Sequence, residues 1–307
     1  MPKRPERTDL HGLLPFAKDA GPSSNQALQQ LRRLLGWVKA GHAGTLDPAA
    51  SVLLLVLLGE AAKLVPYLAD LEKEYVGVVR FGSETDTQDA AGAATRAAPW
   101  AHVDADLIDA RTTSFLGDTL QEPPMYSALQ VGGRRLYDLA REGREVERSA
   151  RRIAVSEMRL LEWRPPDAVI RVRCSSGTYV RTLARDLGMR CGSAAHLAAL
   201  TRTAIGRFRL EDALTIVDVA ALAPGADPPL IRLSDALAHV PALVLGLPEA
   251  RGVLDGRPPL VRAADLPADL LPGATVRLVD GAGRLLAIAR LTASNQPVEL
   301  LRGFKEP

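Results

Sequence analysis

The chain has 307 residues, of which 47% are hydrophobic and 24% charged, so it is long enough to bury one large core or two smaller ones. Its longest apolar run, Val52 to Leu58, is far shorter than the roughly 20 residues that a membrane-spanning helix needs. The polar, charged residues 1–9 lack the apolar stretch of a secretory signal. These features argue against a helical membrane protein and predict a soluble protein of the cytoplasm.

The net charge of +2 is too small to indicate a nucleic-acid-binding protein by itself. Most of the cationic residues are arginines, whose planar group can hold two phosphate oxygens at once, although an arginine-rich proteome would give the same bias. Cys174 and Cys191 have neither metal-ligand spacing nor the partners of a disulfide framework. We expect both to be reduced packing residues, and we expect no metal and no cofactor.

The N-terminal part begins with a helical pattern. Ser23 and Ser24 precede leucines at helical spacing, including Leu34, which predicts a capped amphipathic helix that ends near Gly36. A glycine-containing loop is expected over residues 40–48, before the apolar run.

Strand and helix patterns alternate in the middle of the chain. Residues 75–81 are β-branched and aromatic and predict a strand that enters the acidic loop 82–92. Residues 152–163 and 168–174 predict two further strands joined as a hairpin. Ser176 and Gly177 then begin a helical pattern that ends at 188–192.

The composition changes beyond about Leu222, where proline and glycine become dense, and this change predicts a domain boundary. Residues 275–279 and 284–291 flank the sequence Asp-Gly-Ala-Gly, which is typical of a hairpin turn. Strands and helices are mixed without regular βαβ alternation. The sequence therefore predicts an α+β core built on a largely antiparallel sheet, followed by a small β-rich domain.

The first segment that could carry chemistry is Gly-His-Ala-Gly-Thr-Leu-Asp-Pro at residues 41–48. Pro48 restricts Asp47 to extended geometry, so the carboxylate would project from the loop in a fixed direction. The alternative is that Asp47 only caps a following helix that has Pro48 at its first position. The glycines do not form a phosphate-binding loop, because the expected Lys and Ser or Thr are absent.

A second segment, residues 174–182, leads from a strand through a turn into a helix. It places Arg181 in the first helical turn, where a cation is unfavourable unless a carboxylate or phosphate faces it. The alternative is a surface arginine paired with a nearby carboxylate or with water.

A third segment, from Arg134 to Arg152, combines arginines with acidic residues and Tyr137. Cations with aromatic side chains can follow a nucleic-acid backbone. The alternative is a solvated helix stabilised by pairs such as Arg134 with Asp138.

Together and in this order, the segments resemble the TruB family of tRNA pseudouridine synthases across most of residues 10–210. The similar motifs are Gly41 to Pro48, Gly59 to Lys63, Glu72 to Tyr75, Thr85 to Thr87, Pro123 to Leu129, Arg135 to Tyr137 and Gly177 to Thr182. The C-terminal part is similar to the family's small RNA-binding PUA-like domain in length and strand pattern.

The resemblance implies a role for each site residue. Asp47 would be the nucleophile, Tyr75 would pack on the target base and take part in proton removal, and Arg181 would pair with Asp47. The residues expected to bind the RNA or line the pocket are His42, Lys63, Tyr126, Arg134, Arg135, Tyr179 and Leu200. Among these, His42 would fill the space that the extruded base leaves, because a base inside a folded loop has to leave its stack before an enzyme can act on it.

The resemblance also implies the domain organisation and the substrate. Residues 1–222 would form the catalytic domain, in which a mobile arginine-rich segment at about 122–152 closes over the RNA. Residues 223–307 would form a linker and the PUA-like domain. The expected substrate is tRNA, with the T-loop uridine at position 55 as the target, and no protein partner is required. The isomerisation needs one carboxylate nucleophile and no redox partner.

The chain departs from the family pattern beside the proposed catalytic loop. Lys18-Asp19 replaces Lys-Pro, Val52 replaces a glycine and Gln130 replaces a lysine; Ala43 and Ala49 also differ from the family residues. None of these changes removes a proposed catalytic group. Two other classes stay open, an RNA-binding or RNA-folding protein without turnover and a small-molecule hydrolase.

Overall fold

The computed structural model describes residues 7–44, 50–127, 129–144, 146–223, 225–261, 270–292 and 296–305. Within these residues, the largest element is a nine-stranded sheet with the path β1-β3-β12-β4-β11-β10-β7, to which β2 and β13 add at β3 and β12. Among the described strands of this sheet, only β3 and β12 pair in parallel, over two residue pairs. The strands are β1 Gly12–Lys18, β2 Ala40–Ala43, β3 Ser51–Leu58, β4 Lys73–Phe81, β7 Gly117–Gln121, β10 Arg151–Arg164, β11 Asp167–Cys174, β12 Ala195–Ile205 and β13 Phe208–Arg209.

Strand β3 explains the continuous apolar run, because both of its faces are covered. Its even-numbered side chains, from Val52 to Leu58, pack with α1 (Ser24–Leu34), and its odd-numbered ones pack with residues 61–68. The helix that one interpretation placed after Pro48 is therefore wrong, since a strand begins at Ser51. An apolar run of this length fits a buried helix or a buried strand equally well by periodicity.

The predicted loop at 40–48 is also partly wrong, because Ala40–Ala43 is strand β2, paired antiparallel with β3. Helix α1 is confirmed. Ser23 forms a capping box with Gln26, although Leu34 is 48% exposed and does not join the buried leucines.

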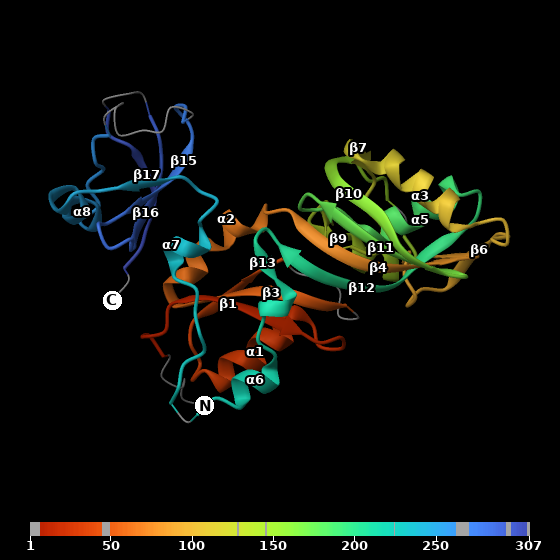
Figure 1. Ribbon diagram of the computed structural model, residues 1–307, viewed down its shortest axis with the longest axis horizontal. Helices are drawn as coiled ribbons and strands as arrows, with labels where there is room; N and C mark the ends of the chain where they lie inside the picture. Colours follow the sequence, from red (N-terminus) through yellow and green to blue (C-terminus); the bar gives the residue numbers. More distant parts are fainter. Residues whose placement is uncertain are drawn as a thin grey trace.

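Helices cover both halves of the large sheet (Figure 1). Helices α3 (Ala105–Thr112) and α5 (Val180–Arg190) pack on β4, β10 and β11, whereas α1 and α6 (Ile216–Ala220) pack beside β1 and β3. The predicted hairpin is confirmed as β10 and β11. The described residues of this part also form helix α2 (Val65–Ala69) and short 3-10 segments at Gly59–Leu64, Thr113–Phe115 and Leu210–Asp212.

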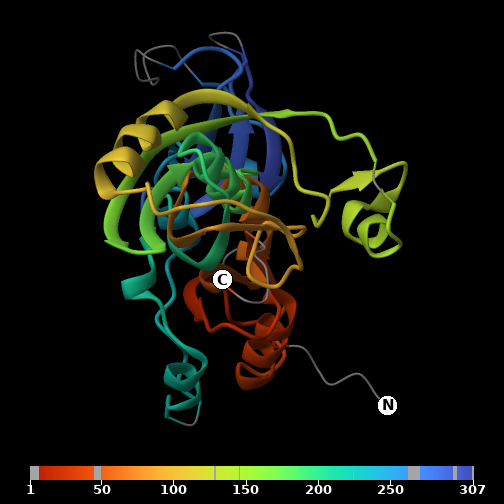
Figure 2. The same cartoon turned by 90° about the vertical axis from the view of Figure 1, so that its right-hand side faces the viewer.

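The arginine-rich segment carries a small hairpin, β8 (Gln130–Val131) with β9 (Arg134–Arg135), and helix α4 (Leu136–Arg141). It stands away from the sheet in Figure 2. A second small hairpin, β5 (Ser83–Thr85) with β6 (Ala94–Ala97), lies within and after the predicted acidic loop.

The C-terminal part is a four-stranded sheet, β14 (Ala242–Val244), β15 (Thr275–Val279), β16 (Leu285–Arg290) and β17 (Glu299–Gly303), with helices α7 (Leu233–Ala236) and α8 (Leu247–Leu254). The predicted hairpin between β15 and β16 is confirmed, and Asp280 fixes its turn by accepting from the backbone N–H groups of Ala282 and Arg284, each at 2.9 Å. Phe304 packs with Leu64 and Leu68 in one cluster, so this sheet contacts the first part of the chain directly.

Among the described residues, no helix combines the length and the apolar character needed to cross a membrane.

Candidate active site

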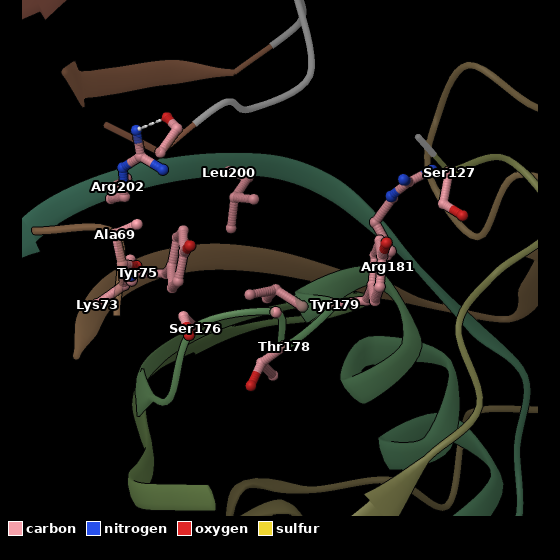
Figure 3. Close-up of a pocket in the computed structure, with 13 residues that line it drawn as sticks. Ala69, Lys73, Tyr75, Ser127, Ser176, Thr178, Tyr179, Arg181, Leu200 and Arg202 are labelled. Carbon is pink, nitrogen blue, oxygen red and sulfur yellow. Dashed lines mark hydrogen bonds between the residues drawn. The ribbon is translucent and has the colours of Figure 1, made fainter. Parts of the chain in front are cut away.

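A cavity of about 300 Å³ lies between strands β4 and β12 and the turn that leads into α5, within the size range of pockets that bind small molecules. Segments far apart in the sequence supply its walls (Figure 3). The lining residues are Gly44, Ala69, Lys73, Tyr75, Ser127, Ser176, Gly177, Thr178, Tyr179, Val180, Arg181, Leu200 and Arg202. Four predicted site residues, Tyr75, Tyr179, Arg181 and Leu200, are therefore brought together.

Tyr75 and Leu200 supply an aromatic side chain and an apolar side chain from the two central strands. Alternation along β4 directs Tyr75 to the buried face of that strand, where it is 6% exposed. Leu200 lies opposite Gly77 in the pairing of β12 with β4, and a Cβ at Gly77 would stand 3.5 Å from the Leu200 side chain. That is an ordinary contact distance, and the tighter approach to the same position is by the Leu197 side chain, at 3.1 Å.

Arg181 is buried at the start of α5 and contacts two other segments. Its Nη1 donates to the Thr87 carbonyl at 3.1 Å and to the Asp89 carboxylate at 3.3 Å, and its Nη2 donates to the Tyr126 carbonyl at 2.9 Å. The alternative interpretation is therefore wrong about a surface position, because Arg181 is buried, but its pairing with a nearby carboxylate is confirmed by Asp89. Its planar group holds the base of the arginine-rich segment and the acidic loop together at the cavity.

Asp89 is a site residue that the sequence interpretation missed. One carboxylate oxygen accepts from the Thr87 hydroxyl at 2.6 Å and from the Ala91 backbone N–H at 3.0 Å, and the other faces Arg181. The Thr87 hydroxyl and the Ala91 backbone N–H therefore hold the Asp89 carboxylate in the orientation in which it faces Arg181. Asp89 lies two residues after the matched motif Thr85 to Thr87, and this proximity is the only sequence feature that points to it.

Tyr179, directly before α5, is fixed through hydrogen bonds to its backbone. The buried Gln121 side chain accepts from the Tyr179 N–H at 2.8 Å and donates to the Tyr179 carbonyl at 3.1 Å. Because Gln121 is the last residue of β7, this pair fixes the cavity wall next to the point where the arginine-rich segment begins.

Lys73 also lines the cavity, and the sequence interpretation did not single it out. It is two residues before Tyr75 on β4, so alternation places both side chains on the same face. Its Nζ donates to the Ala69 carbonyl, and it is 5% exposed. Burial, together with the positive charge of Arg202, lowers the pKa of the Lys73 ammonium to about 8.

We expect Lys73→Met to be more stable than the parent at pH 7, by on the order of 2 kcal/mol, because the parent then buries a charge that the unfolded chain exposes. The lysine pKa is lower in the folded state than in the unfolded state, so the penalty should decrease as pH rises from 8 towards 10.5. Urea unfolding of both proteins between pH 7 and 9.5 tests this expectation. A stability difference that stays constant with pH would contradict it.

His42 lies on β2 and does not line the cavity. Its Nδ1 is buried and has no hydrogen-bond partner among the described residues. Burial lowers the pKa of His42, and the positive charge of Arg202 lowers it further, so the imidazole is neutral at pH 7.

The other predicted RNA contacts also lie outside the cavity. Lys63 donates to Glu60 at 2.6 Å and to the Gly303 carbonyl at 3.1 Å, between the first part of the chain and the C-terminal sheet. The Tyr126 ring packs edge-to-face on Tyr137. Exposed Arg134 pairs with Glu142 rather than with Asp138, the pair given as an example for the solvated-helix interpretation, and the helix itself spans six residues. Arg135 lies in β9, and its side chain is outside the described part.

Asp47, the proposed nucleophile, also lies outside the described residues. Gly44, three residues before it in the sequence, lines the cavity together with Tyr75 and Arg181.

Comparison with known proteins shows the family to which the chain is related. Residues 32–180 match the N-terminal domain of the TruB family pseudouridylate synthases. The chain is 46% identical over 255 residues to tRNA pseudouridine synthase B of Aromatoleum aromaticum, covering 83% of this chain and 82% of that one. It is 42% identical over 301 residues to the protein of the same name from Cupriavidus metallidurans, covering 94% and 93%.

Among solved structures, the fold is similar to a chain in the crystal structure of a Cbf5-Nop10-Gar1 complex, with a TM-score of 0.76 and 25% identity over 96% of this chain and 85% of that one. The fold is thus that of a pseudouridine synthase, an isomerase that acts on uridine in RNA. The chain belongs to the TruB family of pseudouridylate synthases.

Proposed function

We propose that this enzyme isomerises the T-loop uridine at position 55 of tRNA, with Asp47 as its nucleophile. The relatives named above are called tRNA pseudouridine synthases, which supports tRNA as the substrate. The observation that carries the proposal is the cavity in which Tyr75, Leu200 and Arg181 converge beside Gly44, the residue at the start of the segment that contains Asp47.

The reaction breaks the bond between uracil N1 and ribose C1′ and forms a bond between C5 and C1′. The proton on C5 is lost, N1 gains a proton, and no electron is exchanged with another molecule. A single carboxylate, held ionised by a neighbouring arginine, therefore suffices as nucleophile, whether it attacks the ring or the sugar. Arg181 is the arginine proposed to face it.

The uridine must leave the stacked T-loop to reach a cavity of this kind. In the proposal, the Tyr75 ring replaces part of the lost stacking and takes part in removal of the C5 proton, while Tyr179 and Leu200 line the base pocket. His42 fills the vacated position in the RNA. A neutral imidazole suits this role, because a charged ring would be costly among stacked bases.

The remaining predicted residues contact the RNA outside the cavity. Lys63, Tyr126, Arg134 and Arg135 are proposed to bind the T-arm, and the segment at about 122–152 closes over it. Residues 1–222 form the catalytic domain in this proposal, and residues 223–307 form a linker and the PUA-like RNA-binding domain. The enzyme acts in the cytoplasm without a metal, cofactor or protein partner.

The test is isomerisation of an unmodified tRNA transcript labelled with tritium at C5 of its uridines, without added metal or nucleotide. The expected result is release of one tritium per tRNA, with pseudouridine mapped to position 55 and no release from a transcript that has cytidine there. Release from another position would contradict the T-loop assignment. Tight binding without release would support an RNA-binding or RNA-folding protein instead.

A further inference from the structure

Arg202 is the most deeply buried cation in the wall of the cavity, with 1% of its surface exposed. Its Nε and Nη2 donate to the Leu53 carbonyl at 3.0 and 2.8 Å, and Nη2 also donates to the Gly44 carbonyl at 2.6 Å. The bond to Gly44 is the dashed line in Figure 3. Gly44 and Leu53 lie on either side of residues 45–52 in the sequence. One planar group therefore joins the chain before Asp47 to the chain after it.

The close approach at Gly44 depends on the glycine. Its φ of +83° is one that side-chain-bearing residues rarely adopt, and a Cβ there would stand 3.0 Å from Arg202 Nη1. The backbone at Gly44 and the guanidinium of Arg202 thus fit against each other directly.

Arg202 also faces the aromatic residue of the site. Arg202 and Tyr75 are directly paired across β12 and β4, and both line the cavity. Burial lowers the pKa of the Arg202 guanidinium, and its interactions with the Tyr75 side chain oppose that shift. The same guanidinium therefore contacts the backbone on both sides of residues 45–52 and the side chain of Tyr75.

Burying a cation costs free energy, because its charge must be removed from water. Among the described residues, Arg202 contacts carbonyl oxygens and no carboxylate. Its contribution therefore lies in several directed hydrogen bonds from one rigid planar group, which a lysine ammonium cannot reproduce.

We propose that Arg202 is a positioning residue for the isomerisation, which sets the segment that contains Asp47 in register with Tyr75. The inference rests on the proposed function, because Asp47 and Tyr75 are the groups it positions. Displacing reacting groups by about 1 Å can cost on the order of 100-fold in rate, so the effect should appear in the chemical step rather than in binding.

The experiment compares the parent with Arg202→Met and Arg202→Lys under single-turnover conditions with saturating enzyme, and measures tRNA affinity separately. The expected result is a rate lowered roughly 100-fold by Met and at least about 10-fold by Lys, with the Kd for tRNA changed less than about threefold. Arg80→Met is the matched control, because Arg80 is on β4 and pairs with Asp167 at an exposed site. It should keep the parental rate.

A double-mutant cycle separates positioning from a loss of folding. If Arg202 acts through Tyr75, Arg202→Met should cost far less in a Tyr75→Phe background than in the parent, whereas independent effects would multiply. Thermal unfolding of each variant identifies any that do not fold. If Arg202→Met does not fold, Arg202→Lys is used for the same comparison.

Three results would overturn the inference: a parental rate in the folded Arg202→Met or Arg202→Lys variant, a rate loss explained entirely by weaker tRNA binding, or fully multiplicative effects in the cycle. A parent that binds tRNA without isomerising it would instead contradict the proposed function, and the positioning role with it.

Discussion

Replacing Arg181 by lysine is expected to lower the single-turnover rate of pseudouridine formation roughly 100-fold or more, which corresponds to about 2.7 kcal/mol of transition-state stabilisation. The arginine donates through two nitrogens to Thr87, Asp89 and Tyr126, and a lysine ammonium cannot satisfy these acceptors in the same geometry. Loss of the planar group would release the base of the arginine-rich segment and displace the positive charge proposed to face Asp47.

The measurement is tritium release from C5-labelled tRNA at saturating enzyme, beside Arg185→Lys as a control. Arg185 is on the same helix but pairs with Asp186 and does not line the cavity. The control should keep the parental rate. An Arg181→Lys enzyme as fast as the parent would show that the planar group of Arg181 is not needed.

Tyr75→Phe is expected to lower the same rate by a factor of roughly 10² to 10⁴, the usual contribution of a general acid or base, because it removes the hydroxyl group and keeps the ring. Binding of tRNA should change little, since the ring can still replace the lost base stacking. Tyr75→Leu removes the ring as well, and we expect it to weaken binding in addition.

Rates and affinities of both variants test this split, and Tyr67→Phe is the matched control. Tyr67 lies on α2 and packs with the cluster beneath β3, away from the cavity. A parental rate for Tyr75→Phe would exclude a role of the hydroxyl group in proton removal.

The local elements that carry Tyr75 and Arg181 were predictable from the sequence. The β-branched and aromatic residues of 75–81 predict strand β4, and a glycine turn followed by apolar residues at helical spacing predicts α5. These patterns are local, so they do not depend on which segments later pack together.

The missed residues depend on long-range packing. Asp89 meets Arg181 across 92 residues of sequence, and Arg202 meets Leu53 across 149, so no local pattern could pair them. The predicted helix after Pro48 was wrong because an apolar run covered on both faces has no polar side to reveal its period. The cavity lining was therefore predicted only for residues at positions that resemble the family, namely Tyr75, Tyr179, Arg181 and Leu200.

The most direct test of the proposed reaction is pseudouridine formation at the T-loop uridine of unmodified tRNA by the parent and by Asp47→Asn, an isosteric change that removes only the carboxylate charge. We expect full conversion by the parent and none by Asp47→Asn, with equal tRNA affinity for the two proteins. Conversion by Asp47→Asn at the parental rate would contradict it, because the proposed reaction has no other nucleophile.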